Sequence, residues 1–297
     1  MNKKTVVGVW GAGVVGSATG YIFEQLCPEE VDVVYYDLYK EPYKENKLDL
    51  LKRADFIFVC LPTPMSVTGE VCLKYIEQAL SEINSSALYK PGTPVIIRST
   101  SVSGSTDDFA TFNFTNLTLA FCPEFLTEAN SLKDALEPKR IFIGVENPMA
   151  FVRIEELFNK AFNNHSIENP EIIKLTRKEA ETIKYVHNVM LACQVMIANE
   201  LYFICKKLDV NYPKLQCFLY HDKRIGTHTQ VPGPDGDYGF GGKCFPKDLA
   251  AFIYLAEQNG YEPKVLKAVQ TMNEHVRVNK DWLEIPGAVE ENENFEK

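Results

Sequence analysis

The segment Thr5-Val6-Val7-Gly8-Val9-Trp10-Gly11-Ala12-Gly13-Val14-Val15-Gly16 decides the fold of this 297-residue chain. It opens with an apolar run that is typical of a buried strand. The glycines stand in the spacing Gly-x-Gly-x-x-Gly, and a helical pattern continues toward Leu26. A second strand over residues 31–36 ends at Asp37, about 20 residues beyond the glycines. This order of strand, glycine turn, helix, strand and acid predicts a dinucleotide-binding unit.

Each glycine of the turn has an expected role. Gly11 permits the tight turn, Gly13 lets a pyrophosphate approach the helix N-terminus, and Gly16 allows close packing of helix on strand. Val14 and Val15 open the helix, and we include them in the expected cofactor site. Asp37 is expected to accept hydrogen bonds from ribose hydroxyls, which favours NAD over NADP. A purely structural turn is the alternative.

Four further strands are expected, over residues 56–61, 95–98, 118–121 and 141–145. The first three end in the turns Pro62-Thr63-Pro64, Ser99-Thr100 and Cys122-Pro123-Glu124. Ligands of doubly wound sheets bind beyond the carboxyl ends of the strands, so Pro62, Thr63, Ser99 and Thr100 should line the cofactor cleft. The segment 37–55 is too short for the usual further strand and helix. We therefore expect an α/β, Rossmann-type doubly wound parallel sheet over residues 1–170, trimmed at this edge.

The second half reads as an all-helical domain over residues 171–280. Residues 176–208 contain no glycine or proline, and apolar residues occupy most faces, which predicts one long central helix buried all round. Such a helix is expected in a homodimer interface, with a central helix within one subunit as the alternative. Further helices are expected over 212–220, 246–259 and 263–278. The acidic tail 281–297 is expected to be disordered.

A glycine-rich approach to one cysteine, Gly239-Phe240-Gly241-Gly242-Lys243-Cys244-Phe245-Pro246-Lys247-Asp248, suggests an activated thiol. Proline suits the first turn of a helix, so a helix should begin near Pro246. A sulfur at a helix N-terminus, between two lysines, should ionise more readily than an ordinary thiol. Asp248 would then lie close to the sulfur. The alternative is a loop cysteine among structural glycines.

Composition narrows the class of protein. The net charge of −9 argues against nonspecific nucleic-acid binding, which needs basic surface. The eight cysteines show no zinc spacing, so we expect no metal site and a reducing compartment. No run is expected to supply the roughly 18 apolar residues of a membrane span, and the protein is expected to be soluble and cytoplasmic.

Three pairs stand at one-turn spacing, Glu124/Glu128, Lys184/Asn188 and Cys244/Asp248, a spacing that places residues on one helical face. With the glycine fingerprint and the strand-end turns, the ordered motifs resemble the UDP-glucose/GDP-mannose dehydrogenase family. The resemblance rests on Leu61-Pro62-Thr63-Pro64, Arg98-Ser99-Thr100, Phe121-Cys122-Pro123-Glu124-Phe125-Leu126-Thr127-Glu128, Glu181-Thr182-Ile183-Lys184-Tyr185 with Asn188, Ala198-Asn199-Glu200, Arg224-Ile225-Gly226 and the Gly241-to-Asp248 block.

The resemblance implies a four-electron oxidation of a nucleotide-sugar C6 alcohol, UDP-glucose above all, to a carboxylate with two NAD+. Cys244 would attack the aldehyde intermediate, and a thioester would be hydrolysed. Lys184 would stabilise the oxyanion, Asn188 and Asp248 would position water or the reacting oxygen, and Glu124 would be the hydrolytic base. Glu128 would be an acid near the nicotinamide, and Thr100 would order water. Lys184, Asn188, Gly241 and Arg224 would bind substrate, Arg224 that of the neighbouring subunit.

The chain also departs from the family pattern. Full-length members carry a C-terminal nucleotide-binding-like domain, whereas only the acidic tail follows residue 280 here. The loop 232–238 is longer than usual, and the segment 37–55 is shorter. A catalytically idle dinucleotide-binding or assembly protein with this fold therefore remains an alternative, as does an oxidoreductase for another small alcohol.

Overall fold

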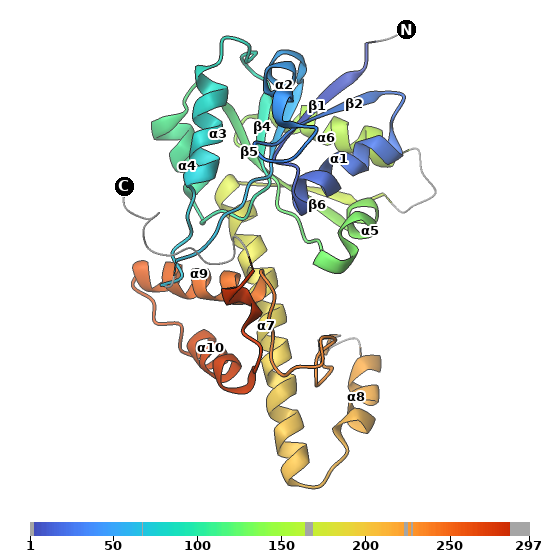
Figure 1. Cartoon of the computed structure of the whole chain (residues 1–297), viewed down its shortest axis with the longest axis vertical. Helices are drawn as coiled ribbons and strands as arrows, with labels where there is room; N and C mark the ends of the chain where they lie inside the picture. Colours follow the sequence, from blue (N-terminus) through green and yellow to red (C-terminus); the bar gives the residue numbers. More distant parts are fainter. Residues whose placement is uncertain (1–2, 67, 164–168, 223–224, 227, 286–297) are drawn as a thin grey trace. The chain divides into compact units, whose positions relative to one another are not determined.

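The computed structural model describes residues 3–66, 68–163, 169–222, 225–226 and 228–285 (Figure 1). Two compact units divide the chain. Unit 1 comprises Met1–Thr63 and Leu73–Lys184, and unit 2 comprises Pro64–Cys72 and Tyr185–Lys297. The division differs from the expected boundary at residue 170, because a strand beyond it pairs within the sheet of unit 1 and a short hairpin near residue 68 groups with unit 2.

Unit 1 contains a seven-stranded sheet in the order β2-β1-β3-β4-β5-β6-β7. The strands are β1 (Thr5–Trp10), β2 (Val31–Tyr36), β3 (Phe56–Val59), β4 (Pro94–Ile97), β5 (Thr118–Phe121), β6 (Arg140–Gly144) and β7 (Glu171–Leu175). Neighbours run parallel except β5 and β6, which meet antiparallel at Phe121 and Gly144. The Rossmann-type fold is confirmed. The antiparallel junction and β7 are additions that the sequence pattern did not predict.

Two apolar layers cover the sheet. Along β1, Val7 and Val9 join the core beneath α1 (Val14–Leu26), α5 (Ser131–Leu136) and α6 (Pro148–Phe162). Val6 and Trp10 join the opposite core, beneath α2 (Lys47–Arg53), α3 (Lys74–Ser85) and η2 (Phe109–Asn113), which follows α4 (Ser105–Asp108). This alternation is the period of two that a strand imposes on its side chains. The sheet is therefore buried on both faces, as its near-continuous apolar strands require.

The trimmed edge of the sheet agrees with expectation. Among the described residues, β2 is the outermost strand on its side. The segment after Asp37 forms η1 (Lys44–Asn46) and the short helix α2 instead of a further strand.

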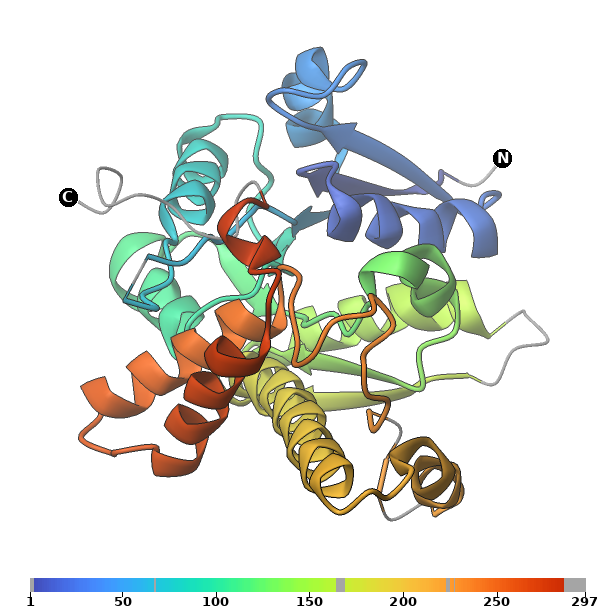
Figure 2. The ribbon, with the colours of Figure 1, turned by 60° about the horizontal axis from the view of Figure 1, so that its bottom comes forward.

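Unit 2 is helical. It contains most of α7 (Arg177–Lys207), with α8 (Tyr212–His221), α9 (Phe245–Gln258) and α10 (Lys264–Val276). Figure 2 shows α9 and α10 side by side, and an ion pair between Lys267 and Glu257 joins them. Their core packs on α7 through Val189, Met196, Phe240, Leu249 and Ile253. These helices match the expected ones within a few residues.

The beginning of the expected disordered tail is ordered instead. Asp281–Leu283 forms the turn η4, and Trp282 in it is 8% exposed. Burial of this large aromatic side chain explains the order. The remainder of the tail, residues 286–297, lies outside the described residues.

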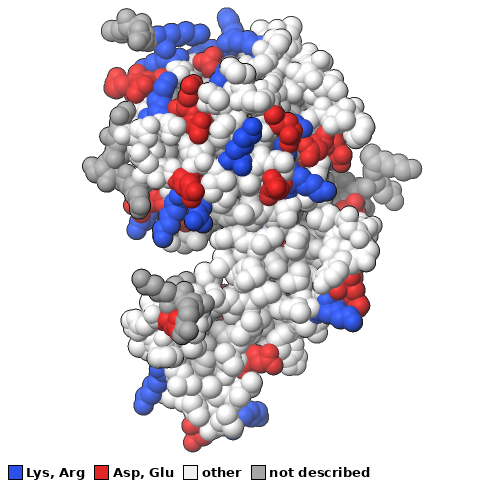
Figure 3. All heavy atoms as spheres, turned by 180° about the vertical axis from the view of Figure 1, so that it is seen from behind, with Lys and Arg blue, Asp and Glu red and all other residues white. Residues whose placement is uncertain are grey.

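Burial of α7 on all sides is wrong for the single chain. Six apolar side chains are 43–67% exposed along the helix and just past its end: Val186, Met190, Ile197, Leu201, Ile204 and Leu208. Figure 3 shows few charged side chains over the helical unit on the face that it draws. The helix is also long and apolar enough to cross a membrane, with a mean hydropathy of 1.4 over its best window, contrary to expectation. That criterion is weak, since core helices of soluble proteins also meet it.

The segment Pro64–Cys72 forms a small hairpin in unit 2. Met65 and Val71 pair across it as an antiparallel bridge, and the backbone N–H of Ser66 donates to the carbonyl of Glu70 at 2.7 Å. Gly69 has φ +89°, and a Cβ there would lie 2.8 Å from the carbonyl oxygen of Ala250. The hairpin is therefore seated directly against the backbone of α9.

Candidate active site

The glycine turn of unit 1 is fixed by contacts that a side chain would break. Gly11 has φ +100°, and a Cβ there would meet the carbonyl oxygen of Cys60 at 2.4 Å. A Cβ on Gly16 would lie only 1.8 Å from the carbonyl oxygen of Gly11, whereas one on Gly13 would meet nothing within 4 Å. Gly13 therefore borders open space at the N-terminus of α1. The first backbone N–H groups of a helix, here those of Val14 and Val15, have no intrahelical acceptor.

Asp37 connects the end of β2 to this turn. Its Oδ2 accepts from the N–H of Ala12 at 2.8 Å, and its Oδ1 accepts from the N–H groups of Tyr39 and Lys40 at 3.0 Å. Burial raises the pKa of Asp37, but these N–H groups and the Lys40 ammonium outweigh it, and the pKa lies below its usual range. The Lys40 Nζ also donates to the carbonyl of Ala12 at 2.9 Å. An ionised carboxylate beside an open helix N-terminus fits NAD.

The predicted turns at the strand ends lie where the topology requires. Ser99 and Thr100 follow β4, and the buried Ser99 hydroxyl accepts from the N–H of Leu61 at 2.8 Å, joining the ends of β3 and β4. Thr63 is buried and Pro62 is exposed. The carboxyl ends of β1, β3 and β4 thus share one edge, where ligands of such sheets bind.

A buried ion pair in unit 1 joins two of the predicted catalytic residues. The Nζ of Lys184, on α7, donates to Glu124 Oε1 at 2.8 Å and to the Glu124 carbonyl oxygen at 2.7 Å. The side chains are only 5% and 10% exposed. Glu124 Oε2 accepts from the N–H of Leu126 at 2.6 Å, and the ring of Phe125 lies 5.6 Å from the ammonium. The arrangement holds a proton-accepting carboxylate against a cation that can stabilise a negative oxygen.

Glu181, one turn before Lys184, anchors α7 to the loop that follows Thr100. This fully buried carboxylate accepts from the N–H of Gly104 at 2.6 Å and the hydroxyl of Ser105 at 2.9 Å. The N–H and hydroxyl of Thr106 also donate to it, at 2.8 and 2.5 Å. Desolvation raises the pKa of Glu181, although these donors oppose the shift. No local pattern predicts this contact, which joins residues more than 70 positions apart.

A second polar network occupies unit 2. Asp248, 1% exposed, accepts from Asn188 Nδ2 at 2.6 Å through Oδ2 and from Lys247 Nζ at 2.6 Å through Oδ1. Asn188 and Lys247 are each 5% exposed. The carboxylate is therefore paired and hydrogen-bonded, as a buried charge requires. Lys247 was expected only as a positive neighbour of the thiol, and its pairing with Asp248 is new.

Asp248 determines which way the Asn188 amide points, and the amide in turn sets the tautomer of His187. Asn188 must present its NH₂ group to the Asp248 carboxylate, which only accepts. Its Oδ1 then faces His187 Nδ1 at 3.0 Å, so that nitrogen carries the hydrogen. Burial lowers the pKa of the nearby His228, and His187 lowers it further.

Cys244 lies immediately before α9, which begins at Phe245, one residue earlier than expected. Its side chain is exposed, and its carbonyl oxygen accepts from the N–H of Asp248 at 2.8 Å. None of the eight cysteines, all within the described residues, forms a disulfide. The thiol is thus accessible at the N-terminal end of a helix and one turn from the Asn188–Asp248–Lys247 network.

The remaining predicted residues have different outcomes. Lys184 and Asn188 share one face of α7, as predicted, but Glu124 lies in a loop and Glu128 begins the turn η3 (Glu128–Asn130), so that pair shares no helix. Arg224 lies outside the described residues. Gly241 lies in the approach to Cys244. Within the part of the chain that is described, no cluster of ligands suited to a metal ion occurs.

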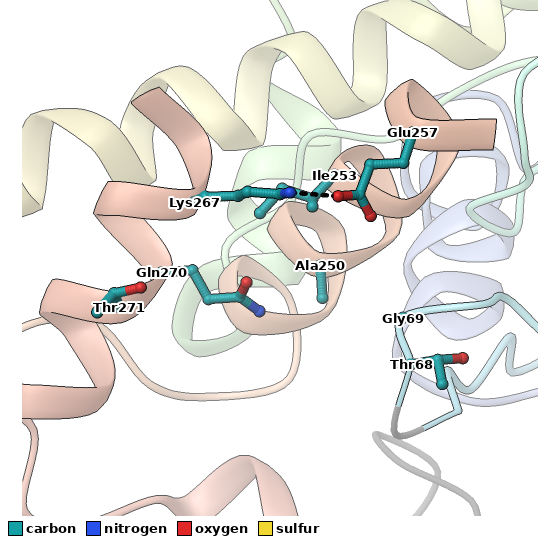
Figure 4. A pocket seen from close by; sticks show the side chains of 8 residues that line it. All are labelled: Thr68, Gly69, Ala250, Ile253, Glu257, Lys267, Gln270 and Thr271. Atoms are coloured by element: carbon teal, nitrogen blue, oxygen red, sulfur yellow. Dashed lines mark ion pairs between the residues drawn. The ribbon is translucent and has the colours of Figure 1, made fainter. Parts of the chain in front are cut away.

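Unit 2 also contains a pocket of about 390 Å³ (Figure 4). It lies between the 64–72 hairpin, α9 and α10, and Lys267 points across it toward Glu257. None of the predicted site residues lines it.

Comparison with known proteins gives two matches to one family. Residues 43–162 match the NAD binding domain of the UDP-glucose/GDP-mannose dehydrogenase family, and residues 178–275 match its central domain. The first match begins beyond the glycine turn, which therefore supports dinucleotide binding independently.

Individual relatives agree with these matches. A UDP-glucose 6-dehydrogenase of Rickettsia bellii is 32% identical over 91% of this chain and 66% of its own length. The UDP-glucose 6-dehydrogenase AglM of Haloferax volcanii is 31% identical over 76% of this chain and 54% of its own. A UDP-glucose dehydrogenase structure from Pyrobaculum islandicum superposes with a TM-score of 0.75 at 27% identity, covering 92% of this chain and 68% of that one. The chain thus spans between about half and two thirds of these curated relatives.

Proposed function

Because this chain belongs to the UDP-glucose/GDP-mannose dehydrogenase family, we propose that it oxidises the C6 alcohol of a nucleotide sugar to a carboxylate. UDP-glucose is the first candidate substrate, since the relatives described above are named UDP-glucose 6-dehydrogenases. The observation that carries the proposal is an accessible Cys244 at a helix start, one turn from a buried Asn188–Asp248–Lys247 network. A chain with no covalent chemistry has no need for that arrangement.

NAD is the cofactor of this unit. Gly11, Gly13 and Gly16 would hold its pyrophosphate at the start of α1, and the Asp37 carboxylate would hold its adenosine ribose. The cofactor supplies hydride acceptance, once for each of the two oxidations. The chain supplies the binding groups, the nucleophile and the proton acceptors.

In the proposed reaction the C6 alcohol first loses a hydride and a proton to give an aldehyde. The Cys244 thiolate then forms a C–S bond at the aldehyde carbon while the carbonyl π bond breaks, and the oxygen takes up a proton to give a thiohemiacetal. Loss of a second hydride and of the hydroxyl proton leaves a thioester. Water adds to the thioester carbon, the C–S bond breaks, and the thiolate is regenerated with the carboxylic acid. Two hydrides leave the substrate and one water enters.

The polar groups of the chain suit these steps. We assign Lys184 to stabilisation of the developing oxyanion and Glu124 to removal of a proton from the hydrolytic water. Asn188 and Asp248 would orient the reacting oxygen, and Thr100 would order the water. Glu128 is assigned as an acid near the nicotinamide. Gly241 and Arg224 would contact the substrate, Arg224 from the neighbouring subunit.

The decisive experiment incubates the purified chain with NAD+ and a panel of UDP- and GDP-sugars while NADH is followed by absorbance. The expected result is two NADH for each uronate formed, with UDP-glucose the best substrate. If NAD binds to the folded protein and no nucleotide sugar is oxidised, the proposal is wrong and an idle dinucleotide-binding protein becomes the better description.

We further propose a soluble, cytoplasmic homodimer formed through α7. The support is the exposed apolar stripe of that helix, which includes Ile197 at 60% and Ile204 at 48% exposure. Exposed apolar surface of this extent is typical of a protein interface. Light scattering should give twice the chain mass for the parent and the chain mass for Ile197→Glu, whereas Glu274→Lys on α10 should remain dimeric. A monomeric parent at micromolar concentration would contradict the proposal.

A further inference from the structure

Side chains from three other segments of unit 2 bind the backbone that leads into Cys244. The N–H of Gly239 donates to Asn199 Oδ1 at 3.0 Å, and the N–H of Gly242 donates to both carboxylate oxygens of Asp281 at 3.1 Å. The carbonyl of Tyr238 accepts from Arg277 Nη1 at 3.4 Å. Side chains distant in the sequence therefore bind this loop at Tyr238, Gly239 and Gly242.

Asn273 of α10 is at the centre of this arrangement. It is 3% exposed, its Oδ1 accepts from the N–H of Phe240 at 2.8 Å, and its Nδ2 donates to the carbonyl of Phe240 at 3.0 Å. Both backbone groups of one residue are thus bound by one amide. A Cβ on Gly239, which has φ +67°, would lie 2.2 Å from Asn273 Oδ1. The glycine is required because the asparagine fills the space beside it.

The contact continues to the residue next to the thiol. The ring of Phe240, 5% exposed, packs edge-on against the ring of Phe245 with their centroids 6.1 Å apart. Phe245 is the first residue of α9 and follows Cys244 directly. A shift of Phe240 therefore displaces the start of the helix at which the sulfur lies.

We propose that Asn273 is a positioning residue for Cys244: by binding both backbone groups of Phe240 it fixes the thiol at the N-terminus of α9. The inference rests on the proposed function for its catalytic meaning. Its physical content, the reactivity of the Cys244 thiol, can be measured without any substrate.

The test substitutes Asn273→Asp. The variant keeps an acceptor for the N–H of Phe240 but turns the donor into an oxygen that faces the Phe240 carbonyl. The rate of alkylation by iodoacetamide is measured at each cysteine by peptide mass spectrometry from about pH 6.5 to about pH 10.5, which is about 2 pH units on either side of an ordinary thiol's pKa of about 8.5. At neutral pH we expect Cys244 to react about tenfold more slowly, with its pH midpoint displaced upward. The exposed Cys217 on α8 should be unchanged and serves as an internal reference.

Two further variants complete the design. Asn259→Asp makes the same chemical change at an exposed asparagine of the same unit and should leave Cys244 at the parent rate. Gly239→Ala displaces the loop from the other side and should slow Cys244 as Asn273→Asp does. If either loop variant fails to fold, Asn199→Ser replaces it. This variant removes the acceptor for the Gly239 N–H and should also slow the alkylation of Cys244.

The outcomes separate the two proposals. Folded loop variants that are alkylated at Cys244 at the parent rate and with the parent pH midpoint would overturn the role of Asn273. A parent protein that forms no NADH with any nucleotide sugar would overturn the proposed function and leave the alkylation result standing. If both proposals are correct, Asn273→Asp should also slow the second oxidation more than the first, so that aldehyde is released.

Discussion

The two glycine-rich turns of this chain each precede a helix, but they are built in opposite ways. At Gly11–Gly16 the glycines are needed because backbone atoms of Cys60 and Gly11 itself come close, and the space beyond Gly13 is open. In the turn Gly239–Gly242, Gly239 and Gly241 face side chains, whereas a Cβ on Gly242 would meet nothing within 4 Å. Asn199, Asn273 and Asp281 bind backbone N–H groups of this turn. The first turn leaves room for a ligand. The second is held by side chains and fixes a residue in place.

If the second turn exists to hold a nucleophile, Cys244→Ser should have the largest effect. A serine hydroxyl is a far weaker nucleophile than a thiolate near neutral pH, so uronate formation should fall by at least about a thousandfold. The measurement is uronate produced per enzyme, with bound NAD and the melting temperature as controls. Uronate formed at the parent rate would show that the turn serves structure alone.

The closeness of the backbone in the first turn is tested by Gly16→Ala. The new methyl group would meet the carbonyl oxygen of Gly11, which is fixed in the turn and cannot move aside as a side chain could. We expect a loss of about 3 kcal/mol in the free energy of unfolding and loss of NAD binding. Urea titration followed by fluorescence measures the first quantity. A free energy of unfolding equal to that of the parent would mean that the backbone of the turn can move to accommodate the methyl group.

Gly13→Ala is the matched change where the space is open. With φ −72° the backbone already suits alanine, so the melting temperature should stay within a degree or two of the parent. The methyl group would occupy the space expected for the pyrophosphate, and NAD should bind about tenfold more weakly by calorimetry, or about 1.4 kcal/mol. Unchanged affinity would show that this space does not receive the cofactor.

The same change in the second turn, Gly241→Ala, should cost less than Gly16→Ala. Its methyl group would meet the Arg277 guanidinium and the Asp281 carboxylate, which are ends of side chains and can shift. We expect about 1 kcal/mol of destabilisation in the same urea titration. A loss as large as that of Gly16→Ala would remove the distinction between the two turns.

The smallest effect concerns pH and the first turn. The folded-state pKa of Asp37 is depressed, so its contribution to stability is present above its ordinary value of 3.8 and is lost as pH falls through the folded pKa. Asp37→Asn should therefore lower the melting temperature at pH 7 and less so below pH 3.8, with under about 1 kcal/mol at stake because the site is partly exposed. A difference that grew on acidification would contradict this sign.

Local patterns predicted much of this molecule. The strand, glycine turn and acid of the nucleotide unit lie close in sequence, and their chemistry is set by residue type, so Gly11, Gly16 and Asp37 could be placed directly. The Lys184/Asn188 spacing on α7 was likewise readable. In contrast, β7 alternates only weakly between buried and exposed positions, so its pattern does not predict a strand. No local sequence feature indicates that β6 pairs antiparallel with β5.

The contacts that organise the site were not readable in this way. Glu181 with Thr106, Asn199 with Gly239, and Asn273 with Phe240 join residues between 33 and 75 positions apart. Asparagine and glutamate are common on helix surfaces, so their residue type gives no hint of burial. The exposed face of α7 was missed for a related reason. An apolar helix pattern predicts burial, but it does not indicate whether the helix is buried by its own chain or by another chain.

The hairpin Pro64–Cys72 has a consequence for the order of events during synthesis. It belongs to unit 2, yet it leaves the ribosome roughly 180 residues before Ala250, against which Gly69 is seated. At 5–20 residues per second, translation leaves it waiting for roughly 10–35 s. All seven strands of the unit 1 sheet, the last of which ends at Leu175, are made before that interval ends, so the sheet can form before α9 exists. Helix α9 must therefore arrive at a hairpin that was made long before it, so a late part of unit 2 packs on the part of this unit that was made first.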